Sequence, residues 1–249
     1  MQHLIVELEA VGQRAWPPLV VQGLDGWLVR YTPGVPRRRS NSVVTLTYEG
    51  DLAASIAAVE AFYAERGLDA RFHLTPATEP TGLDDELARR GYTVESPTIV
   101  MTAPVVQGTR RSVALLEQVN DTWMATWNRT KDRDTDLTRS RIFDRIEPTH
   151  RFALASDEGH PVGVGLGVCD EGWLGIFSVA VVDDARRRGH GTALVDALLA
   201  WGRDASADHA YLQVEEHNAG ARTAFDRLGF REAYRYHYRR ANTRAAVSS

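Results

Sequence analysis

The chain of 249 residues is poor in cysteine and has no long apolar run. Cys169 is its single cysteine, so no intrachain disulfide can form, and a reducing compartment is expected. No apolar run approaches the ~20 residues that span a bilayer, and the first residues lack the basic-then-apolar pattern of a signal peptide. These absences predict a cytoplasmic protein that does not enter a membrane.

The sequence also has little excess charge. Its 29 basic and 33 acidic residues leave a formal net charge of −4, and Lys131 is the only lysine. Proteins that bind nucleic acid or acidic lipid through charge carry a basic excess, so neither partner is expected. The eight histidines show no metal-ligand spacing and the cysteine stands alone. We therefore expect no metal site.

The length allows one large domain or two of ordinary size. Pro104 and Gly108 interrupt strand-like sequence near the middle of the chain, as a joint between domains does. We therefore predict one domain over 1–108 and a second over 109–249. A hydrophobic fraction of 43% provides enough apolar material for a core in each.

The second half combines a strand meander with alternating strands and helices. Alternation and turn composition predict strands at Ser112–Gln118, Arg151–Ser156, Val162–Cys169, Trp173–Val182 and Tyr211–Val214, and a final pair from Phe230. Helical spacing predicts helices after Asn120, from Asp134 or Thr135 to about Ile146, after Gly191 to about Asp204, and between Asn218 and Gly229. This order indicates an α+β fold with a mixed, mostly antiparallel sheet and flanking helices.

The first half has a fainter version of the same order. Strands are predicted at Gly26–Tyr31, Ser40–Tyr48 and Ala70–Leu74, and helices at Leu52–Arg66 and Leu83–Arg90. The helix ending Gly91-Tyr92 mirrors Gly229-Phe230, which indicates a degenerate internal repeat. The alternative is that a glycine followed by an aromatic residue is simply a common way for a helix to end.

The segment Arg186–Thr192 has the composition of an anion-binding loop. It lies between a strongly apolar strand and an amphipathic helix. Gly189 and Gly191 let the backbone approach a ligand closely, and a helix start presents N–H groups that have no intrahelical acceptor. The three arginines before Gly189 add charged donors suited to phosphate. On these residues alone, a basic turn without a ligand is an equally open interpretation.

The neighbours of this loop carry a family resemblance. Arg186, Gly189 and Gly191 match the Gln/Arg-x-x-Gly-x-Gly/Ala signature of the pyrophosphate loop in the GNAT superfamily of N-acetyltransferases. The preceding Phe177–Val182 is similar to the family strand whose backbone pairs with pantetheine. Downstream, Asn218–Phe230 resembles the family's Asn-x-x-Ala…Leu-Gly-Phe helix. The three pieces stand in the family's order, and the repeat then implies two tandem GNAT-like units.

The resemblance implies an acyl-CoA-dependent N-acyltransferase that moves an acetyl group from acetyl-CoA, its cosubstrate, to a primary amine of a small molecule or peptide. It also implies the residues that contact acetyl-CoA, namely Val179, Val181, Arg186, Arg187, Arg188, Gly189, His190, Gly191, Thr192, Asn218 and Phe225. In the family, backbone N–H groups near Val179–Val181 hold the thioester carbonyl, which is oxyanion-type stabilisation.

One position departs from the family pattern. Many GNAT enzymes protonate the leaving thiolate with a tyrosine at the position of Phe225, and phenylalanine has no proton to give. A general acid contributes ~10²–10⁴-fold to a rate, so the loss affects catalysis more than binding. Ser178 is a candidate replacement. Water remains an alternative, as do three tyrosines of the last predicted strand, Tyr234, Tyr236 and Tyr238.

The acceptor amine must lose a proton before it attacks the thioester. An amine with a pKa of ~10.4 is mostly protonated at neutral pH, so a general base or a water chain is required. Glu215 is our candidate base, with Glu171 and His217 as alternatives, because all three flank the strands that would open the cleft. The competing interpretation is that residues 215–217 form a solvated loop.

Two further patterns have a structural and a functional interpretation. Gly163, Gly165 and Gly167 lie within a predicted strand and not before a helix, so they do not form a dinucleotide site. Glycines on a strand permit close packing or the approach of a ligand, and the family resemblance would place this room beside the substrate cleft. Trp123 and Trp127, one helical turn apart, belong either to the core or to an apolar acceptor pocket.

The first half lacks the anion loop. Only Glu49-Gly50-Asp51 stands between its predicted strand and helix, and the two acids would repel pyrophosphate. We therefore predict that domain 1–108 is a degenerate unit without CoA binding, which completes the sheet and shapes the acceptor cleft. Mycothiol synthases are examples of such tandem GNAT proteins.

Two other functions remain open at this point. The first alternative is a non-catalytic acyl-CoA-binding or sensing module, which Phe225 and the degenerate first half motivate. The second is an interaction domain without a CoA site. Identity of the acceptor and length of the acyl chain are not encoded in a recognisable motif, because acceptors vary widely on this fold. We expect a monomer or a homodimer.

Overall fold

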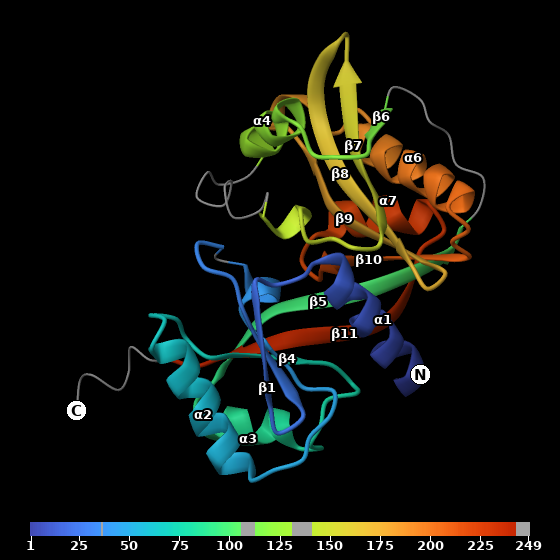
Figure 1. Ribbon diagram of the computed structural model, residues 1–249. Helices are drawn as coiled ribbons and strands as arrows, with labels where there is room; N and C mark the ends of the chain where they lie inside the picture. The colour runs from blue at the N-terminus through green and yellow to red at the C-terminus, as the bar shows by residue number, and fades with distance from the viewer. Residues whose placement is uncertain (36, 106–112, 131–140, 243–249) are drawn as a thin grey trace. The chain divides into compact units, whose positions relative to one another are not determined.

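The computed structural model describes residues 1–35, 37–105, 113–130 and 141–242. The chain divides into two compact units. Figure 1 shows the chain coloured by residue number from the N-terminus to the C-terminus. Unit 1 comprises Met1–Glu7, Pro18–Ile99 and Tyr234–Ser249. Unit 2 comprises Leu8–Pro17 and Val100–Ala233. Within the described residues, no helix is both long and apolar enough to cross a bilayer.

The sheet of unit 1 has the strand order β1-β2-β3-β4-β11. Its elements are β1 (Val20–Leu24), β2 (Trp27–Tyr31), β3 (Val43–Val44), β4 (Arg71–Leu74), β11 (Arg231–Arg240), α2 (Leu52–Ala64), α3 (Leu83–Arg89) and the 3₁₀ turn η1 (Arg38–Ser40). Strands β3 and β4 are parallel, and the other pairs of this sheet are antiparallel.

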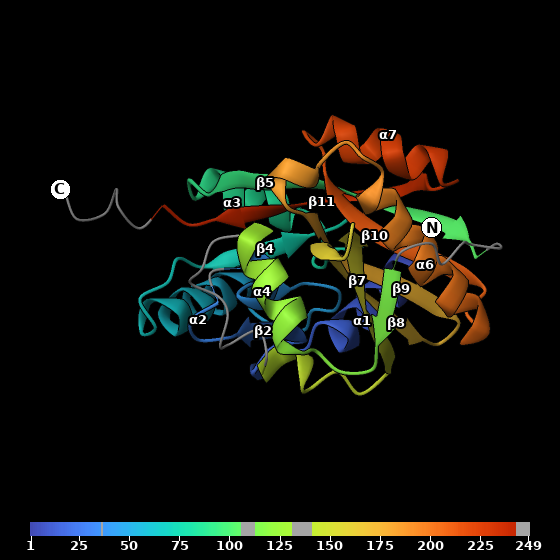
Figure 2. The same ribbon diagram turned by 90° about the horizontal axis from the view of Figure 1, so that it is seen from above.

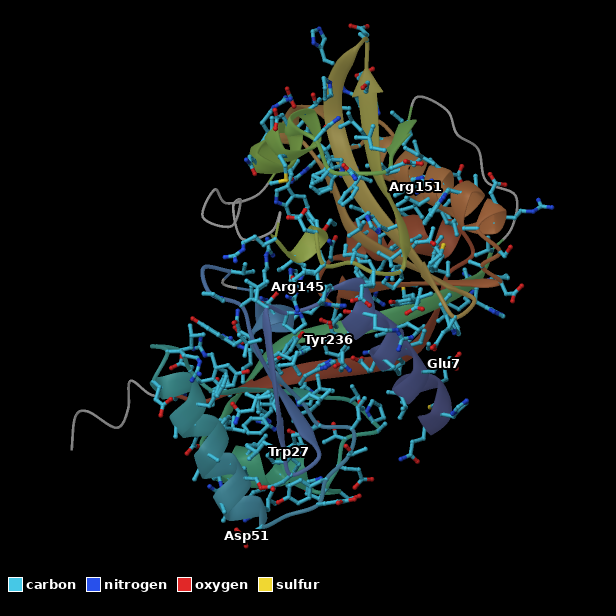
Figure 3. The ribbon with its side chains drawn as sticks, in the orientation of Figure 1. Glu7, Trp27, Asp51, Arg145, Arg151 and Tyr236 are labelled. Atoms are coloured by element: carbon cyan, nitrogen blue, oxygen red, sulfur yellow. The ribbon has the colours of Figure 1, made fainter. Side chains whose placement is uncertain are left out.

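Side chains from both helices and three strands of unit 1 form one core. Trp27, labelled in Figure 3, is fully buried together with Phe72 of β4, Ile56 and Tyr63 of α2, and Leu83 of α3. Burial of such large side chains supplies ~1.5–3 kcal/mol each, so this cluster holds α2 and α3 on the sheet.

The sheet of unit 2 has the order β5-β10-β9-β8-β7-β6, and Figure 2 shows its helices from above. The elements are α1 (Gln2–Ala15), whose last residues belong to this unit, β5 (Thr93–Pro104), β6 (Val113–Leu116), α4 (Asp121–Thr130), β7 (Thr149–Asp157), β8 (His160–Asp170), β9 (Trp173–Val181), the 3₁₀ turn η3 (Asp183–Ala185), α6 (His190–Asp204), β10 (His209–Glu215) and α7 (Ala219–Arg227). Strands β6 to β9 form an antiparallel meander, and β10 is parallel to β9. The predicted α+β class with a mixed, mostly antiparallel sheet is confirmed.

Two strands pass from one unit into the other. The last strand, β11, leaves unit 2 at Ala233 and pairs with β4 of unit 1, with His237 opposite Leu74. Strand β5 leaves unit 1 at Ile99 and lies beside β10 in unit 2. Each unit therefore receives a strand from the other half of the sequence. The predicted boundary after Gly108 lies outside the described residues.

Several predicted elements differ from the structure. The strand predicted at Ser40–Tyr48 is reduced to Val43–Val44, because η1 precedes it and Thr45 bonds through its hydroxyl to the carbonyl of His73 at 3.0 Å. The strand pair predicted after Phe230 is the single strand β11. Helix α1 and strand β1 were not predicted at all. The predicted helix from Asp134 or Thr135 lies largely outside the described residues.

The glycines of β8 make room for α6 and not for a ligand. A Cβ on Gly167 would lie 2.9 Å from Leu198 and 3.1 Å from Trp201, and one on Gly163 would lie 3.2 Å from Leu194. Real Cβ atoms essentially never approach below 3.0 Å. The close-packing interpretation of this Gly-x-Gly-x-Gly run is therefore the one that the structure supports.

The paired tryptophans of α4 are core residues. Trp123 is fully buried, and its ring stacks on that of Trp127 with centroids 5.7 Å apart. The indole N–H of Trp123 donates to the carbonyls of Ala153 and Gly165 at 3.1 and 3.3 Å. These bonds satisfy the buried indole of Trp123, so the structure supports the core interpretation of this pair, in which this helix face packs on the meander.

Candidate functional site

The candidate site lies in unit 2, where the parallel strands β9 and β10 stop pairing. Their ladder runs from Trp173 opposite His209 to Ile176 opposite Leu212. Strand β9 is buried up to Phe177, whereas Ser178–Val181 are only half-buried although most of them are apolar. In sheets with parallel strands, ligands bind at the carboxyl ends where neighbouring strands separate. Residues 178–181 therefore present an accessible strand edge at such a position.

A β-bulge distorts β9 at the same place. Val164 pairs with Ala180, but Leu166 pairs with Phe177, so two residues of β9 stand where β8 has one. Ser178 has φ 55°, which is uncommon for a residue other than glycine. A bulge re-aims backbone groups and occurs often beside active sites. Here it turns the backbone of Ser178 and Val179 out of the regular ladder.

The predicted anion loop follows this strand and opens α6. Gly189 is the N-cap residue at φ 89°, and no side chain of the described residues caps the helix. A Cβ on Gly189 would meet nothing within 4 Å, and one on Gly191 would meet only a Val181 methyl group at 3.8 Å. The backbone at Gly189 and Gly191 thus has open space beside it, and the first turn of α6 has no side-chain cap among the described residues. This is the arrangement that binds phosphate at a helix start.

Two of the three loop arginines are bound to acids of the protein. Arg186 donates through Nε to the carbonyl of Val181 at 3.2 Å and forms a 2.7 Å ion pair with Asp183. Arg188 lies 3.3 Å from a carboxylate oxygen of Asp157, which is also 3.6 Å from His190 Nε2. These contacts hold the loop against β9 and the β7–β8 hairpin, so Arg186 and Arg188 shape the loop in addition to charging it.

Helix α7 shows the predicted cap and the unusual phenylalanine. Asn218 caps it by accepting a hydrogen bond from the backbone N–H of Ala221 at 3.2 Å. Phe225 is half-buried, and its ring lies 6.1 Å from that of Phe230 in an edge contact. No residue of α7 is buried. The helix therefore keeps an accessible surface on which Phe225 provides apolar contact but no proton.

The structure brings two of the predicted catalytic candidates to one edge of the sheet. Ser178 and Glu215 both lie beyond the last paired residues of β9 and β10, at the carboxyl ends of these strands. The Glu215 side chain is 41% exposed and lies 3.4 Å from His217, which is 80% exposed. Glu171 lies in the turn before β9, at the opposite end of that strand, and pairs with Arg14 at 3.0 Å. Glu171 is therefore set aside as a base.

Other candidate groups are buried. Burial raises the pKa of the Cys169 thiol to about 12, so this cysteine is not a nucleophile at neutral pH. The three tyrosines that sequence analysis considered as acids are buried in the unit 1 part of β11, and Figure 3 labels Tyr236 among them. Among the described residues, no three acidic, histidine or cysteine side chains are grouped to hold a metal ion.

In unit 1, the start of the helix α2 and the end of the parallel strand pair β3–β4 are occupied by the protein's own groups. At the start of α2, Asp51 accepts a hydrogen bond from the backbone N–H of Ala54 at 2.8 Å, and Asp25 accepts one from the Ser55 hydroxyl at 2.5 Å. Beyond the parallel pair β3–β4, the backbone N–H of Glu79 donates to the carbonyl of Thr45 at 2.7 Å. The helix start therefore carries the protein's own carboxylates, and the chain itself fills the gap between the strands.

Comparisons with known proteins agree with this geometry. The model of the family described as the C-terminal region of the probable histone acetyltransferase Rv0428c matches residues 4–239. The uncharacterized N-acetyltransferase YobR of Bacillus subtilis is 26% identical over 246 residues, which cover 94% of this chain and 98% of that protein. The probable histone acetyltransferase Rv0428c of Mycobacterium tuberculosis is 28% identical over 235 residues, covering 90% and 70%.

Solved structures show the same fold. A GCN5-related N-acetyltransferase from Kribbella flavida has a TM-score of 0.69 at 13% identity, with 95% of both chains covered. A tandem GNAT protein from the clavulanic acid biosynthesis pathway has a TM-score of 0.61 at 14% identity, covering 94% of this chain and 87% of that one. Since the family model spans nearly the whole sequence, the chain belongs to the Rv0428c C-terminal family and with it to the GNAT superfamily of acyl-CoA-dependent N-acetyltransferases.

Proposed function

We propose that the protein transfers the acetyl group of acetyl-CoA to a primary amine of a small molecule or peptide. The observation that carries this proposal is the uncapped start of α6 at Gly189, next to the bulged end of β9. The start of α6 favours an anion and would bind the pyrophosphate. The bulge in β9 frees backbone donors, which would bind the thioester carbonyl. The two relatives, which this chain matches over 98% and 70% of their length, are both named as acetyltransferases, and this supports the same reaction.

The loop would hold the pyrophosphate of acetyl-CoA. In this proposal the backbone N–H groups of residues 189–192 bind the phosphate oxygens, and the exposed Arg187 adds charge. Val179 and Val181 would pair through their backbone with pantetheine. Asn218 and Phe225 of α7 would line the other side of the same cosubstrate. Arg186, Arg188 and His190 keep the loop in place through their contacts with Val181, Asp183 and Asp157.

In the chemical step the acceptor ammonium has to lose two protons, and the leaving thiolate has to gain one. The Glu215 carboxylate would accept a proton from the acceptor ammonium, and the neutral amine would attack the thioester carbonyl carbon to form the new C–N bond. Backbone N–H groups at the bulge would stabilise the oxyanion. When the C–S bond breaks, the hydroxyl of Ser178 would give a proton to the thiolate, directly or through water, and would take in its place the second proton that the nitrogen loses as the amide forms. Both roles rest on the position of these two residues at the same sheet edge.

A non-catalytic acyl-CoA-binding module is not favoured. Phe225 and the degenerate first half motivated it, but the family model that spans residues 4–239 describes an acetyltransferase. For unit 1, by contrast, we propose that acyl-CoA binding is lost. Asp25 and Asp51 place negative charge where a pyrophosphate would have to bind at α2.

The test is the thermal stability of the full chain with and without saturating CoA and acetyl-CoA. A ligand at about 100 times its Kd stabilises the folded state by ~2.7 kcal/mol, which raises Tm measurably. In Gly189→Asp, which puts a carboxylate at the helix start, this rise should vanish. Gly91→Asp is the matched control, because Gly91 also has a positive φ and open space but lies in unit 1.

Each outcome decides between the proposals. A rise in wild type and Gly91→Asp, but not in Gly189→Asp, supports the loop as the CoA site, and release of free CoA with added amines then tests transfer. Stabilisation that persists in Gly189→Asp would place the cosubstrate elsewhere. No stabilisation of folded wild-type protein, shown to be free of bound CoA, would contradict the proposal.

A further inference from the structure

The hairpin between β7 and β8 brings a carboxylate to the loop at the start of α6. Asp157 is the last residue of β7 and pairs with His160, the first residue of β8. Its Oδ2 lies 3.3 Å from a guanidinium nitrogen of Arg188 and 3.6 Å from Nε2 of His190. Arg188 and His190 stand directly before and after Gly189, the N-cap residue of the helix. One carboxylate therefore contacts both neighbours of the residue at which α6 begins.

The hairpin that carries Asp157 is held in place from two sides. Its turn consists of residues 158 and 159, both with positive φ, as in the tight turns that favour hairpins. Next to the turn the register shifts, so β8 bulges by one residue. There the carbonyl of Val162 accepts a 2.9 Å hydrogen bond from the backbone N–H of Val182, and the carbonyl of Pro161 accepts one of 2.9 Å from Arg129 of α4. The tip is thus tied to the end of β9 and to α4.

The loop contains backbone that needs such a support. Arg187 has φ 64° and Gly189 has φ 89°, so two left-handed residues stand on either side of Arg188. The left-handed region is unfavourable for arginine, and a residue stays there only where the surrounding contacts hold it. Left-handed residues also help to form the backbone concavities that bind anions. Among the described residues, the side chain that lies between these two positions, that of Arg188, has its ion pair with Asp157.

The exposure of this ion pair indicates a local effect. The side chain of Arg188 is 63% exposed, and exposed ion pairs add little to the free energy of unfolding. A carboxylate alone would repel a pyrophosphate, but the charge of Arg188 matches that of Asp157, so the pair adds little net field at the helix start. What the pair fixes is the path of the backbone from residue 187 to residue 189.

We propose that Asp157 is a positioning residue for acetyl-CoA, which acts through Arg188 and His190 to hold the loop in the left-handed path that binds the pyrophosphate. This role rests on the proposed function of the loop as the CoA site. Since Asp157 acts on the loop and not on the thioester, its loss weakens binding of the cosubstrate and leaves the chemical step unchanged.

Titration of CoA into the full chain by isothermal titration calorimetry tests this role. Asp157→Asn keeps the shape of the side chain but removes its charge, and it should raise the Kd for CoA by about three- to fivefold. Asp157→Glu keeps the charge and should recover most of the affinity. The KM for acetyl-CoA should follow the Kd, with kcat little changed. The matched control is Glu158→Gln, which removes one negative charge from the exposed next residue of the same turn and should leave the Kd unchanged.

A double substitution shows whether Asp157 acts through Arg188. In an Arg188→Gln background, Asp157→Asn should weaken CoA binding less than in wild type, or even strengthen it, because the carboxylate is then unmatched and repels the pyrophosphate. Equal factors in the two backgrounds would overturn the role.

Three further results would also overturn the role of Asp157. They are a Kd that is unchanged or lower in Asp157→Asn, an equal rise in Glu158→Gln, and a fall in kcat with an unchanged Kd. Failure of the proposed function has a different signature, since wild-type protein would then bind no CoA at all, and the role of Asp157 would fall with it.

Discussion

The carboxylate of Asp25 accepts a 2.5 Å hydrogen bond from the hydroxyl of Ser55, in the first turns of α2. This contact marks the difference between the two units. In unit 1 the start of α2, which follows the parallel strand β3, bonds to two carboxylates of the protein, those of Asp25 and of the N-cap residue Asp51. In unit 2 the corresponding start at Gly189 has no side-chain cap among the described residues. The same local geometry is therefore capped by a side chain in one unit and uncapped among the described residues of the other.

The role of Asp25 can be tested by the substitution Asp25→Asn. It removes the charge that accepts from Ser55 in a partly buried place, and a hydrogen bond to a charged group contributes ~1.5–3 kcal/mol. We expect the free energy of unfolding in urea to fall by about 1–2 kcal/mol. Asp144→Asn, at an exposed aspartate, should change it little. An equal effect of both substitutions would show that Asp25 has no special role at α2.

Substitutions of Ser178 can distinguish a catalytic role of its hydroxyl from a role of the bulged backbone. If the hydroxyl is the proton donor, Ser178→Ala and Ser178→Gly should both lower kcat by about 10²-fold or more, with the KM for acetyl-CoA little changed. Steady-state release of CoA measures both constants. Glycine adopts the observed φ of 55° without strain, whereas alanine there costs ~1–2 kcal/mol. Normal kcat in the glycine variant would assign the role of this position to the backbone.

Strand exchange predicts that the halves do not fold separately. A fragment 109–249 lacks β5, which lies beside β10, and its own β11 loses the partner β4. We expect this fragment to show no cooperative thermal transition by circular dichroism and no stabilisation by CoA, because a strand edge and part of the core would be exposed. Co-expression with a fragment 1–108 should restore both. Cooperative unfolding and CoA binding by 109–249 alone would contradict the prediction.

The cluster at Asp84 predicts a pH-dependent contribution to stability. Burial acts to raise the pKa of Asp84, but hydrogen bonds and charges from Arg239 and His237 outweigh it, and the pKa is lowered from its usual 3.8. A carboxyl with a lowered pKa in the folded state stabilises that state above the unfolded pKa and loses this contribution as the pH falls through the folded one. Asp84→Asn should therefore destabilise the chain at pH 7, and this effect should shrink as the pH falls below the usual pKa of 3.8.

Urea unfolding of wild type and Asp84→Asn across this pH range is the measurement. Glu65→Gln, at a 75% exposed glutamate, is the control for loss of one acidic charge in unit 1. A difference between wild type and Asp84→Asn that stays constant from neutral to acid pH would show that the ion pairs of Asp84 do not contribute.

Most elements of unit 2 could be predicted from the sequence because their signals are local. Asn218 caps α7 and Gly189 precedes α6, as the residue types require. The strand predicted at Ser40–Tyr48 was too long, because propensity cannot show that Arg38–Ser40 form a 3₁₀ turn or that the carbonyl of Thr45 would accept a hydrogen bond from the backbone N–H of Glu79. The bulge at Ser178 also escaped prediction, since it arises from the register between β8 and β9.

The sequence by itself determined the family and the fold class and predicted an anion loop at the start of α6, because these depend on residue types at fixed spacing within short segments. Tertiary structure alone decided which candidates share an edge, placing Ser178 and Glu215 at the carboxyl ends of β9 and β10 and Glu171 at the other end of β9. It also decided that β11 completes the sheet of unit 1, bringing His237 to Asp84 across 153 positions of sequence. Pairing over such a distance depends on long-range packing and backbone hydrogen bonds, which no local pattern records.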